Sequence, residues 1–200
     1  MKIIALIALF AVLCIVSIGP ASATAIVKLS NDPASPDWNV LSPAWSLLNK
    51  KLDGSGVSTL SPKIVSSSVF PSDRTFSVKF RTIIRGTQDW YTAWMVGKYV
   101  SEFNRTVVIL HNSGVLELAA SESGTTGLVD HIYTTSTALS NLDWHTLNVV
   151  YTGNVAQVSI DGKHYLAVTD PIIGSLGACH VELASWGNSE SQFRSTTIKF

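Results

Sequence analysis

The sequence predicts an all-β protein in which two antiparallel sheets pack face to face around a core. Three observations predict this fold class. Apolar residues recur at every second position in several stretches, which is the period of a strand buried on one face. Turn-forming clusters of Gly, Ser, Asn and Asp separate these stretches at the spacing typical of sandwiches and barrels. No stretch shows a helical period, and we expect at most a single turn at Leu139–Leu142.

The first 25 residues have the features of a secretory signal peptide. Met1-Lys2 gives a short positive start, Ile3–Ile18 is apolar apart from Ser17, and Ala21–Ala25 contains small-x-small cleavage sites. The apolar run is short for a membrane-spanning helix, which needs roughly 20 residues; an uncleaved anchor is the alternative. We therefore expect a protein that is secreted or held at the cell surface, with residues 26–200 as a single domain.

Charge and cysteine content restrict the partners of this domain. Removing Lys2 with the leader leaves 13 basic residues against 14 acidic ones. The domain is therefore near neutral and lacks the basic stripe that binds nucleic acid, so no nucleic acid partner is expected. Cys179 is the one cysteine outside the leader, which excludes an intrachain disulfide. We expect it to be buried as a small apolar residue.

The clearest single strand signal lies at 76–84. There Phe76, Val78, Phe80, Thr82 and Ile84 alternate with Ser77, Lys79, Arg81 and Ile83. Asn31–Pro43 is rich in Pro, Asp and Ser, which indicates a loop or a mobile lead-in. Further strands are expected at 93–98, 106–111, 115–120, 181–185 and 193–200.

Three consecutive strands are expected between Asp143 and Val168. The first ends at Tyr151, the second covers Val155–Ile160, and the third begins at Lys163 after Asp161-Gly162, a pair that supplies the positive φ of a tight turn. In the first strand, Leu147, Val149 and Tyr151 are expected to face the core, with His145, Asn148 and Val150 on the other face. Trp144 opens this strand, and we expect it to be buried between the sheets.

Several of these segments resemble one known family. Asp143-Trp144-His145-Thr146 followed by Asp161-Gly162 is similar to a signature of laminin G-like, concanavalin A-like jelly-roll domains. Trp38-Asn39-Val40 followed by Trp45–Gly56 is similar to their opening, although Ser42-Pro43-Ala44 and Lys50 replace the usual Ser-Gly and Gly. Phe76–Phe80 resembles their first long core strand. The resemblance implies a jelly-roll sandwich whose closing strand, ending at Ile198, pairs with the N-terminal strand, and a carbohydrate ligand.

The motifs of common hydrolases are missing. Related glucanases carry Glu-x-Asp-x-x-Glu, which places carboxylates on one face of a strand for acid and nucleophile roles; it does not occur here. Gly-x-Ser-x-Gly, His-x-His and His-Glu-x-x-His do not occur either, which leaves a serine nucleophile and zinc unsupported. Glu117 and Glu182 lie in expected strands and could face each other across a cleft, or could be ordinary outward positions. We assign no catalytic residue.

Calcium is a possible cofactor. The resemblance implies a rim of loops at which Asp side chains and backbone carbonyls can bind calcium. The loop candidates are Asp89, Asp130, Asp143 and Asp170, none of which lies in a dense Asp-x-Asp-x-Asp run. The sequence therefore assigns no metal-binding residue.

An aromatic and polar cluster is the best candidate for ligand binding. Trp90, Tyr91 and Trp94 lie within five residues, and Asn104 and Arg105 lie in the following loop. Sugar rings stack their apolar faces on indole and phenol rings, while amide and guanidinium groups bind the hydroxyls. Core packing is the alternative for these aromatic residues, and it is the interpretation we favour for Trp186. Asn104-Arg105-Thr106 is also a glycosylation sequon, and a glycan there would lie close to this site.

The sequence thus predicts an exported, non-catalytic module that binds a glycan or cell-surface polysaccharide, or mediates adhesion. A glycoside hydrolase or lyase of the same superfamily is the first alternative. A structural surface-assembly protein with protein partners at the cell surface is the second.

Overall fold

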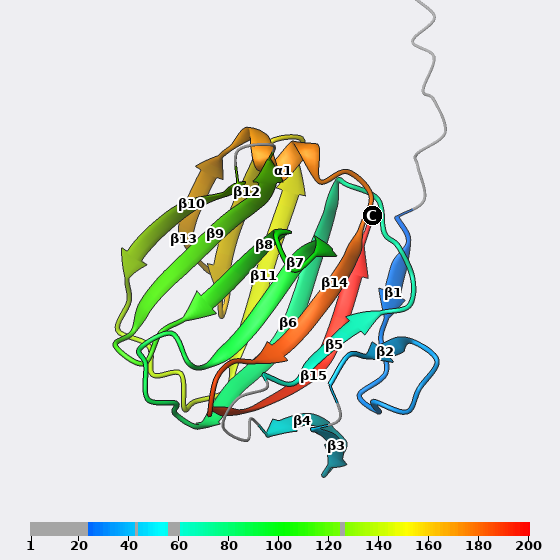
Figure 1. Cartoon of the computed structure of the whole chain (residues 1–200), viewed down its shortest axis with the longest axis vertical. Helices are drawn as coiled ribbons and strands as arrows, with labels where there is room; N and C mark the ends of the chain where they lie inside the picture. Colours follow the sequence, from blue (N-terminus) through cyan, green and yellow to red (C-terminus); the bar gives the residue numbers. More distant parts are fainter. Residues whose placement is uncertain (1–23, 43, 56–60, 125–126) are drawn as a thin grey trace, which may run out of the picture.

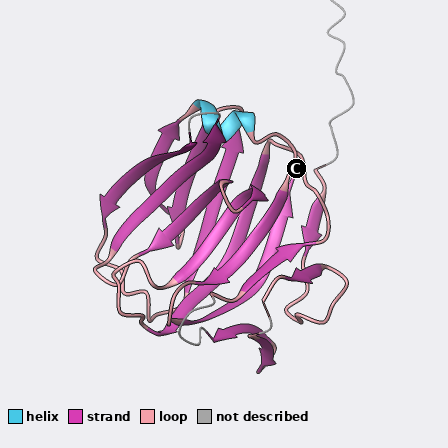
Figure 2. Cartoon of the chain, in the orientation of Figure 1, coloured by secondary structure: helices cyan, strands magenta, loops and turns pink. Residues whose placement is uncertain are grey.

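Two antiparallel sheets packed face to face form the structure, a computed structural model that describes residues 24–42, 44–55, 61–124 and 127–200 (Figures 1 and 2). The predicted leader lies outside the described residues up to position 23. In the described part, the eight-stranded sheet has the order β13 (Lys163–Thr169), β12 (Val155–Ile160), β11 (His145–Thr152), β6 (Arg74–Ile84), β15 (Glu190–Lys199), β4 (Lys51–Ser55) and β3 (Trp45–Leu48), with β1 (Ile26–Lys28) paired to β15. The seven-stranded sheet has the order β10 (Gly127–Ser136), β9 (Val115–Gly124), β8 (Asn104–Leu110), β7 (Ala93–Ser101), β14 (His180–Ser185), β5 (Lys63–Ser66) and β2 (Trp38–Val40).

The strands predicted from alternation are confirmed. In β6 the residues from Arg74 to Thr82 alternate between buried and half-buried, as a strand against a core requires. β11, β12 and β13 form two consecutive hairpins, and Asp161 and Gly162 have φ values of 52° and 80° in the second turn. The expected pairing of the closing strand with the N-terminal strand is also confirmed, because Val27 in β1 lies opposite Ile198 in β15.

Two predictions about the start of β11 are wrong. His145 is buried on the same face as Leu147, because the two residues are separated by an even step along the strand. Its Nδ1 lies 2.6 Å from Asp161 Oδ2, so the expected structural role is fulfilled from the inner face. Trp144 precedes the strand and is half-buried rather than enclosed between the sheets. Cationic groups of Lys51, Arg81 and Arg194 lie 5.3, 4.9 and 4.4 Å from its ring centroid.

Some short or weakly patterned strands and the one helix of the described residues were not predicted from the sequence. β10 is an edge strand whose residues 130–136 are exposed or half-buried, so no apolar alternation marks it. The helix α1 (Pro171–Ser175) begins at Asp170, whose carboxylate accepts a hydrogen bond from Ile172 N at 2.8 Å. It is too short to show a period. In the part of the chain that the structure describes, no helix has the length and apolar character to cross a bilayer.

The core lies between the sheets, but polar groups join them at one end. Arg74 of β6 is buried and donates hydrogen bonds to the carbonyl oxygens of Phe70, Pro71 and Cys179 at 3.0 Å and of His180 at 3.2 Å, and also to that of Gly97. Most of these acceptors belong to or adjoin the opposite sheet. The buried core itself is made of apolar residues from both sheets, among them Phe76, Val78, Phe80, Leu147, Val149, Met95, Val108, Leu110, Leu116, Leu118 and Leu183.

A second polar contact reaches across the sandwich beside Arg74. Tyr151 of β11 is fully buried, and its hydroxyl lies 2.8 Å from Thr106 Oγ1 on β8. A Cβ at Gly97 would lie only 2.2 Å from Tyr151 Oη, so glycine is required in β7 at this crossing. Lys98 is buried next to it and donates to Ile173 O at 2.6 Å and to Ser72 Oγ at 2.9 Å. Burial lowers the pKa of Lys98.

The Arg74 network generates a stability prediction. Arg74→Lys should lower the free energy of unfolding by about 3 kcal/mol or more, because one ammonium group cannot serve carbonyls spread around a planar guanidinium. The exposed Arg85→Lys is the matched control and should change it by less than about 0.5 kcal/mol. Urea unfolding followed by far-ultraviolet circular dichroism measures both, and equal effects would contradict the role given to Arg74.

The corrected position of Trp144 generates a second prediction. Trp144→Ala should cost about 1 kcal/mol, the scale of partly exposed cation–π contacts. Phe80→Ala, which leaves a cavity in the core, should lower the free energy of unfolding by about 3–5 kcal/mol. Thermal unfolding of both variants tests this, and a loss at Trp144 as large as that at Phe80 would show that the indole is a core residue after all.

Candidate functional site

The outer face of the seven-stranded sheet carries the candidate site. Side chains alternate across a strand, so Val108 and Leu110 of β8 face the core whereas Val107 and Ile109 face outward. All four are nonetheless buried. A strand that is apolar on both faces is covered on both. Aromatic side chains provide the cover on the outer face.

These aromatic side chains form a stacked group that we name the tryptophan wall, made of Trp90, Trp94 and Trp186. Trp94 and Trp186 stack with ring centroids 4.3 Å apart and planes 11° apart. Trp90 leans on both, with centroids 6.1 and 6.5 Å away. Trp94 Nε1 donates to the backbone oxygen of Trp90 at 2.9 Å, which fixes the two rings relative to each other. Trp94 is only 8% exposed, whereas Trp90 is 38% exposed, with the Tyr91 ring in a T-shaped contact at 4.4 Å between centroids.

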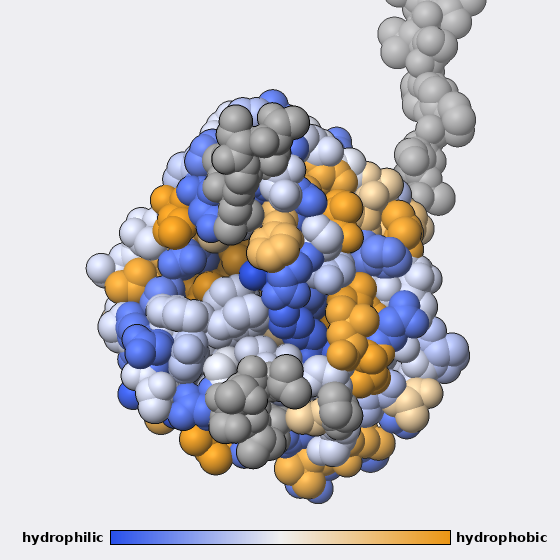
Figure 3. All heavy atoms as spheres, in the orientation of Figure 1, coloured by the Kyte–Doolittle hydropathy of each residue, from blue (hydrophilic) through white to orange (hydrophobic). Residues whose placement is uncertain are grey.

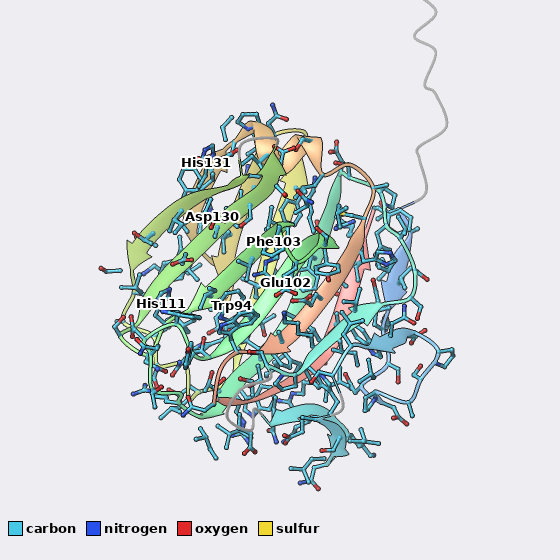
Figure 4. The ribbon with its side chains drawn as sticks, viewed as in Figure 1. Trp94, Glu102, Phe103, His111, Asp130 and His131 are labelled. Carbon is cyan, nitrogen blue, oxygen red and sulfur yellow. The ribbon has the colours of Figure 1, made fainter. Side chains whose placement is uncertain are left out.

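A groove of about 360 Å³ runs from this wall across β8 and β9 to β10. Its volume lies within the range of small-ligand sites. Figure 4 shows Trp94, His111 and Asp130 on the same side of the sheet, with Asp130 higher and further left in the view than Trp94. The groove is lined by Trp90, Trp94, Arg105, Val107, Ile109, His111, Glu117, Ala119, Ser121, Asp130 and Ile132.

Three of the five predicted ligand residues line the groove, and two do not. Trp90, Trp94 and Arg105 are in its lining. Tyr91 instead packs against glycine backbone: a Cβ at Gly187 would lie 2.4 Å from its ring. Asn104 has both ends of its amide engaged, donating to Ser101 Oγ at 2.9 Å and accepting from Ser123 N at 2.8 Å.

A chain of three titratable side chains supports the groove from the side of the Trp90 loop. His111 Nδ1 lies 3.1 Å from Asp89 Oδ2, and its Nε2 lies 3.1 Å from Glu117 Oε2. Burial would lower the pKa of His111, but hydrogen bonds and charge from Glu117 and Asp89 raise it above the ordinary value. Asp89 also accepts from Ser113 N at 2.7 Å and from Ser113 Oγ at 2.8 Å. The loop that carries Trp90 is therefore anchored next to Glu117.

A buried ion pair lies at the other end of the tryptophan wall. Arg105 Nη1 is 3.8 Å from Glu182 Oε1, and the guanidinium carbon lies 5.2 Å from the Trp94 ring and 5.6 Å from the Trp186 ring. Glu182 is wholly buried, and neither of its carboxylate oxygens has a hydrogen-bond partner among the described residues. Burial therefore outweighs the attraction of Arg105 and Lys63 and raises the pKa of Glu182 to about 7.

The carboxylates of Glu117, Asp130 and Glu182 are not spaced for paired catalysis with one another. Glu182 lies in β14 and Glu117 in β9, three strand spacings or about 14 Å apart across the sheet. Asp130 lies opposite Ser121, four residues from Glu117 and so about 13 Å along the strand. The two carboxyl groups of glycosidases lie roughly 5–9.5 Å apart. In addition, Glu182 is out of reach of any substrate.

The acidic residues proposed for calcium are spread apart. Asp170 caps α1 and also receives the Tyr133 hydroxyl and His131 Nδ1, each at 2.7 Å. Asp89 is occupied by Ser113 and His111, Asp143 is exposed, and Asp130 lines the groove. Across residues 24–200, apart from the gaps named above, no three His, Cys, Asp or Glu side chains converge on one point. The four aspartates therefore do not come together around one ion.

Sequence reasoning missed part of the lining. Glu117 is expected either as half of a catalytic pair or as an ordinary outward position, and Asp130 as a calcium ligand, while His111 and Ile132 are not singled out. The alternation of Glu117, Ala119 and Ser121 indicates that the three side chains share one face of a strand. It does not indicate which strands lie on either side of that strand. Trp186, assigned to packing, does pack, but on the outer face against Trp94 rather than between the sheets.

Comparison with known proteins identifies the fold. No protein-family profile and no curated protein sequence matches the chain. Among solved structures, the carbohydrate-binding module CBM66 from Bacillus subtilis superposes with a TM-score of 0.66 at 12% identity, covering 82% of this chain and 96% of that one. The β-glucanase of Bacillus licheniformis superposes with a TM-score of 0.66 at 9% identity, covering 88% and 97%. A β-1,3-1,4-glucanase (lichenase) from a mouse hindgut metagenome gives 0.65 at 9% identity, covering 87% and 98%. These neighbours are concanavalin A-like jelly-roll sandwiches, and this chain has the same fold.

The buried carboxyl group generates a pH prediction. Because the pKa of Glu182 is raised in the folded state, its contribution to stability is complete below its ordinary pKa of 4.5 and is lost as the pH rises through about 7. Between pH 4 and pH 8 this loss should be on the order of 3 kcal/mol. Glu182→Gln stays neutral, so this variant should lose that much less stability than the parent over the same interval.

Urea unfolding at pH 4, 6 and 8 measures the effect. Glu122→Gln, a half-buried position of β9, is the control and should follow the parent. A Glu182→Gln variant whose stability depends on pH as the parent's does would contradict the raised pKa.

Proposed function

We propose that the protein is an exported, non-catalytic module that binds a glycan in the groove on the outer face of its seven-stranded sheet. The observation that carries the proposal is the exposed ring of Trp90, held on the tryptophan wall above a groove with polar lining. Indole faces stack on the apolar faces of sugars, and polar groups along the groove bind the hydroxyls.

Other observations support a carbohydrate ligand. The fold neighbours include a protein named as a carbohydrate-binding module and others named as glucanases. Export follows from the leader-like sequence at 1–25 and would bring the groove to extracellular or cell-surface polysaccharide. The signature from Asp143 to Gly162 also favours a place among the laminin G-like branch of the fold.

Trp90→Ala tests the proposal. A glycan array probed with the parent protein first identifies a glycan that binds, and titration calorimetry then measures the affinity of the parent and the variant for that glycan. Removal of the exposed ring should lower affinity about thirtyfold, the scale of an aromatic hot spot, without changing the melting temperature. Trp144→Ala removes an indole outside the groove and should leave affinity unchanged. Retained affinity in Trp90→Ala would place the ligand elsewhere.

A hydrolase or lyase is the competing function, since Glu117 is held in the groove by His111. The same ligand incubated with the parent protein and examined by mass spectrometry distinguishes the two. The binding module should leave it intact, whereas cleavage that disappears in Glu117→Gln would establish an enzyme.

A further inference from the structure

Arg105 connects the groove with the carboxyl group buried behind it. The side chain lies in the groove lining, and its guanidinium carbon is 5.2 Å from the centroid of the Trp94 ring. Nε and Nη1 are enclosed without a hydrogen-bond partner among the described residues, whereas Nη2 is not enclosed and has no such partner either. Arg105 therefore has a free donor for a bound molecule, while its charge reaches back to Glu182.

The Arg105–Glu182 pair is held just beyond hydrogen-bond distance. Nη1 lies 3.8 Å from Oε1, whereas a hydrogen bond from nitrogen to oxygen spans roughly 2.7–3.2 Å. Glu182 is wholly buried, and neither of its oxygens has a partner in the described part of the chain. A buried carboxylate requires donors, and the nearest unused ones belong to Arg105. An ionised Glu182 would therefore draw the guanidinium toward β14, whereas a neutral Glu182 would not.

The other charged groups around Glu182 do not compete for this role. Besides Arg105, the titratable side chains near it are Lys63 of β5, Tyr99 of β7, Glu102 after β7 and, on β14 itself, His180. Lys63 is paired with Glu102. Burial and the charge of Glu182 raise the pKa of Tyr99, so this phenol is neutral near pH 7. Figure 3 shows hydrophilic side chains running down the middle of this face between more apolar areas. Arg105 is the cation that joins Glu182 to the groove.

We infer that Glu182 is a positioning residue for the ligand, and that the groove binds a glycan more tightly when Glu182 is protonated than when it is ionised. The inference rests on the proposed function. With Glu182 neutral, Arg105 Nη2 is free to donate to a hydroxyl oxygen of a glycan that stacks on Trp90. With Glu182 ionised, the guanidinium is drawn away and this contact weakens. By linkage, a bound glycan favours the protonated carboxyl group.

The affinity should therefore change near neutral pH. Burial raises the pKa of Glu182 to about 7, so affinity should be high in mild acid and fall as the pH rises through that value. His111 also lies in the groove. Burial would lower the pKa of His111, but its hydrogen bonds with Glu117 and Asp89 raise it. A change at Glu182 leaves any contribution from His111 in place, so the two are separable.

Titration calorimetry at pH 5.5, 7 and 8.5 tests the inference with probes that do not titrate: neutral hexasaccharides of β-1,3-linked glucose, β-1,4-linked glucose and β-1,4-linked N-acetylglucosamine, together with the array glycan that binds most tightly. Affinity of the parent protein should fall on the order of tenfold across this range, which corresponds to a pKa difference of about one unit between free and bound protein. Glu182→Gln cannot ionise and should lose this dependence. Glu122→Gln, outside the groove, is the control and should retain it.

Two further readouts do not depend on the affinity of the variant. Repeating the calorimetry on the parent protein at pH 7, in buffers with different enthalpies of ionisation, should show that protons are taken up when the glycan binds. Without a glycan, tryptophan fluorescence of the parent protein should show a step near pH 7, because a movement of Arg105 changes the surroundings of Trp94 and Trp186. Glu182→Gln should lack this step.

The outcomes separate this inference from the proposed function. Glycan affinity that stays constant between pH 5.5 and 8.5, or a pH dependence that survives unchanged in Glu182→Gln, would overturn the inference and leave glycan binding in place. Binding of the glycan to the parent protein without proton uptake at pH 7 would overturn it as well. No binding of any probe, together with an array that yields no ligand, would overturn the proposed function and the inference with it.

Discussion

The buried guanidinium of Arg74 holds the two sheets together at the end of the sandwich where β6 begins. Arg74 has no carboxylate within ion-pair distance in the described residues, so its charge is met by backbone carbonyls and by Cys179 Sγ, which lies 3.2 Å from Nη2. Those carbonyls belong to Phe70, Pro71, Gly97, Cys179 and His180, and a buried charge must keep nearly all such partners to be tolerated. The strand that begins at Arg74 and the strands opposite are therefore held in one relative position.

That fixed position determines the outer face as well. The carbonyl oxygen of Gly97 accepts a hydrogen bond from Arg74, and the absence of a side chain at Gly97 leaves room for the Tyr151 ring. In addition, the pairing of β7 with β8 is irregular between Val96 and Lys98. On one side of this irregularity Trp94 faces outward to form the tryptophan wall, while on the other Lys98 turns into the core. The candidate site on the outer face and the polar contacts between the sheets therefore both depend on β7.

Several charged groups of the outer face are paired within the protein itself. His111 is held between two carboxylates, and Arg105 is held between Glu182 and two indole rings. Such pairs fix side-chain positions at little gain in stability, since each member is taken out of water. These pairs lie beside the groove, whose lining also includes the partly exposed Trp90.

The sequence by itself determined the strands and the face on which most of their residues lie, because a period of two is a local property that survives any arrangement of the sheets. It also determined the tight turn at Asp161-Gly162 and the aromatic cluster around Trp90, whereas the jelly-roll class and the pairing of the closing strand with the N-terminal strand were implied by the resemblance to a known family. Only the tertiary structure decided which strands became neighbours. That order brought Glu117 and Asp130 into the groove with Trp94. Tyr91 and Asn104 instead make local packing contacts, and Trp144 lies next to cationic side chains rather than in the core. Contacts between residues far apart in the chain depend on sheet order and register, which no single stretch of sequence encodes.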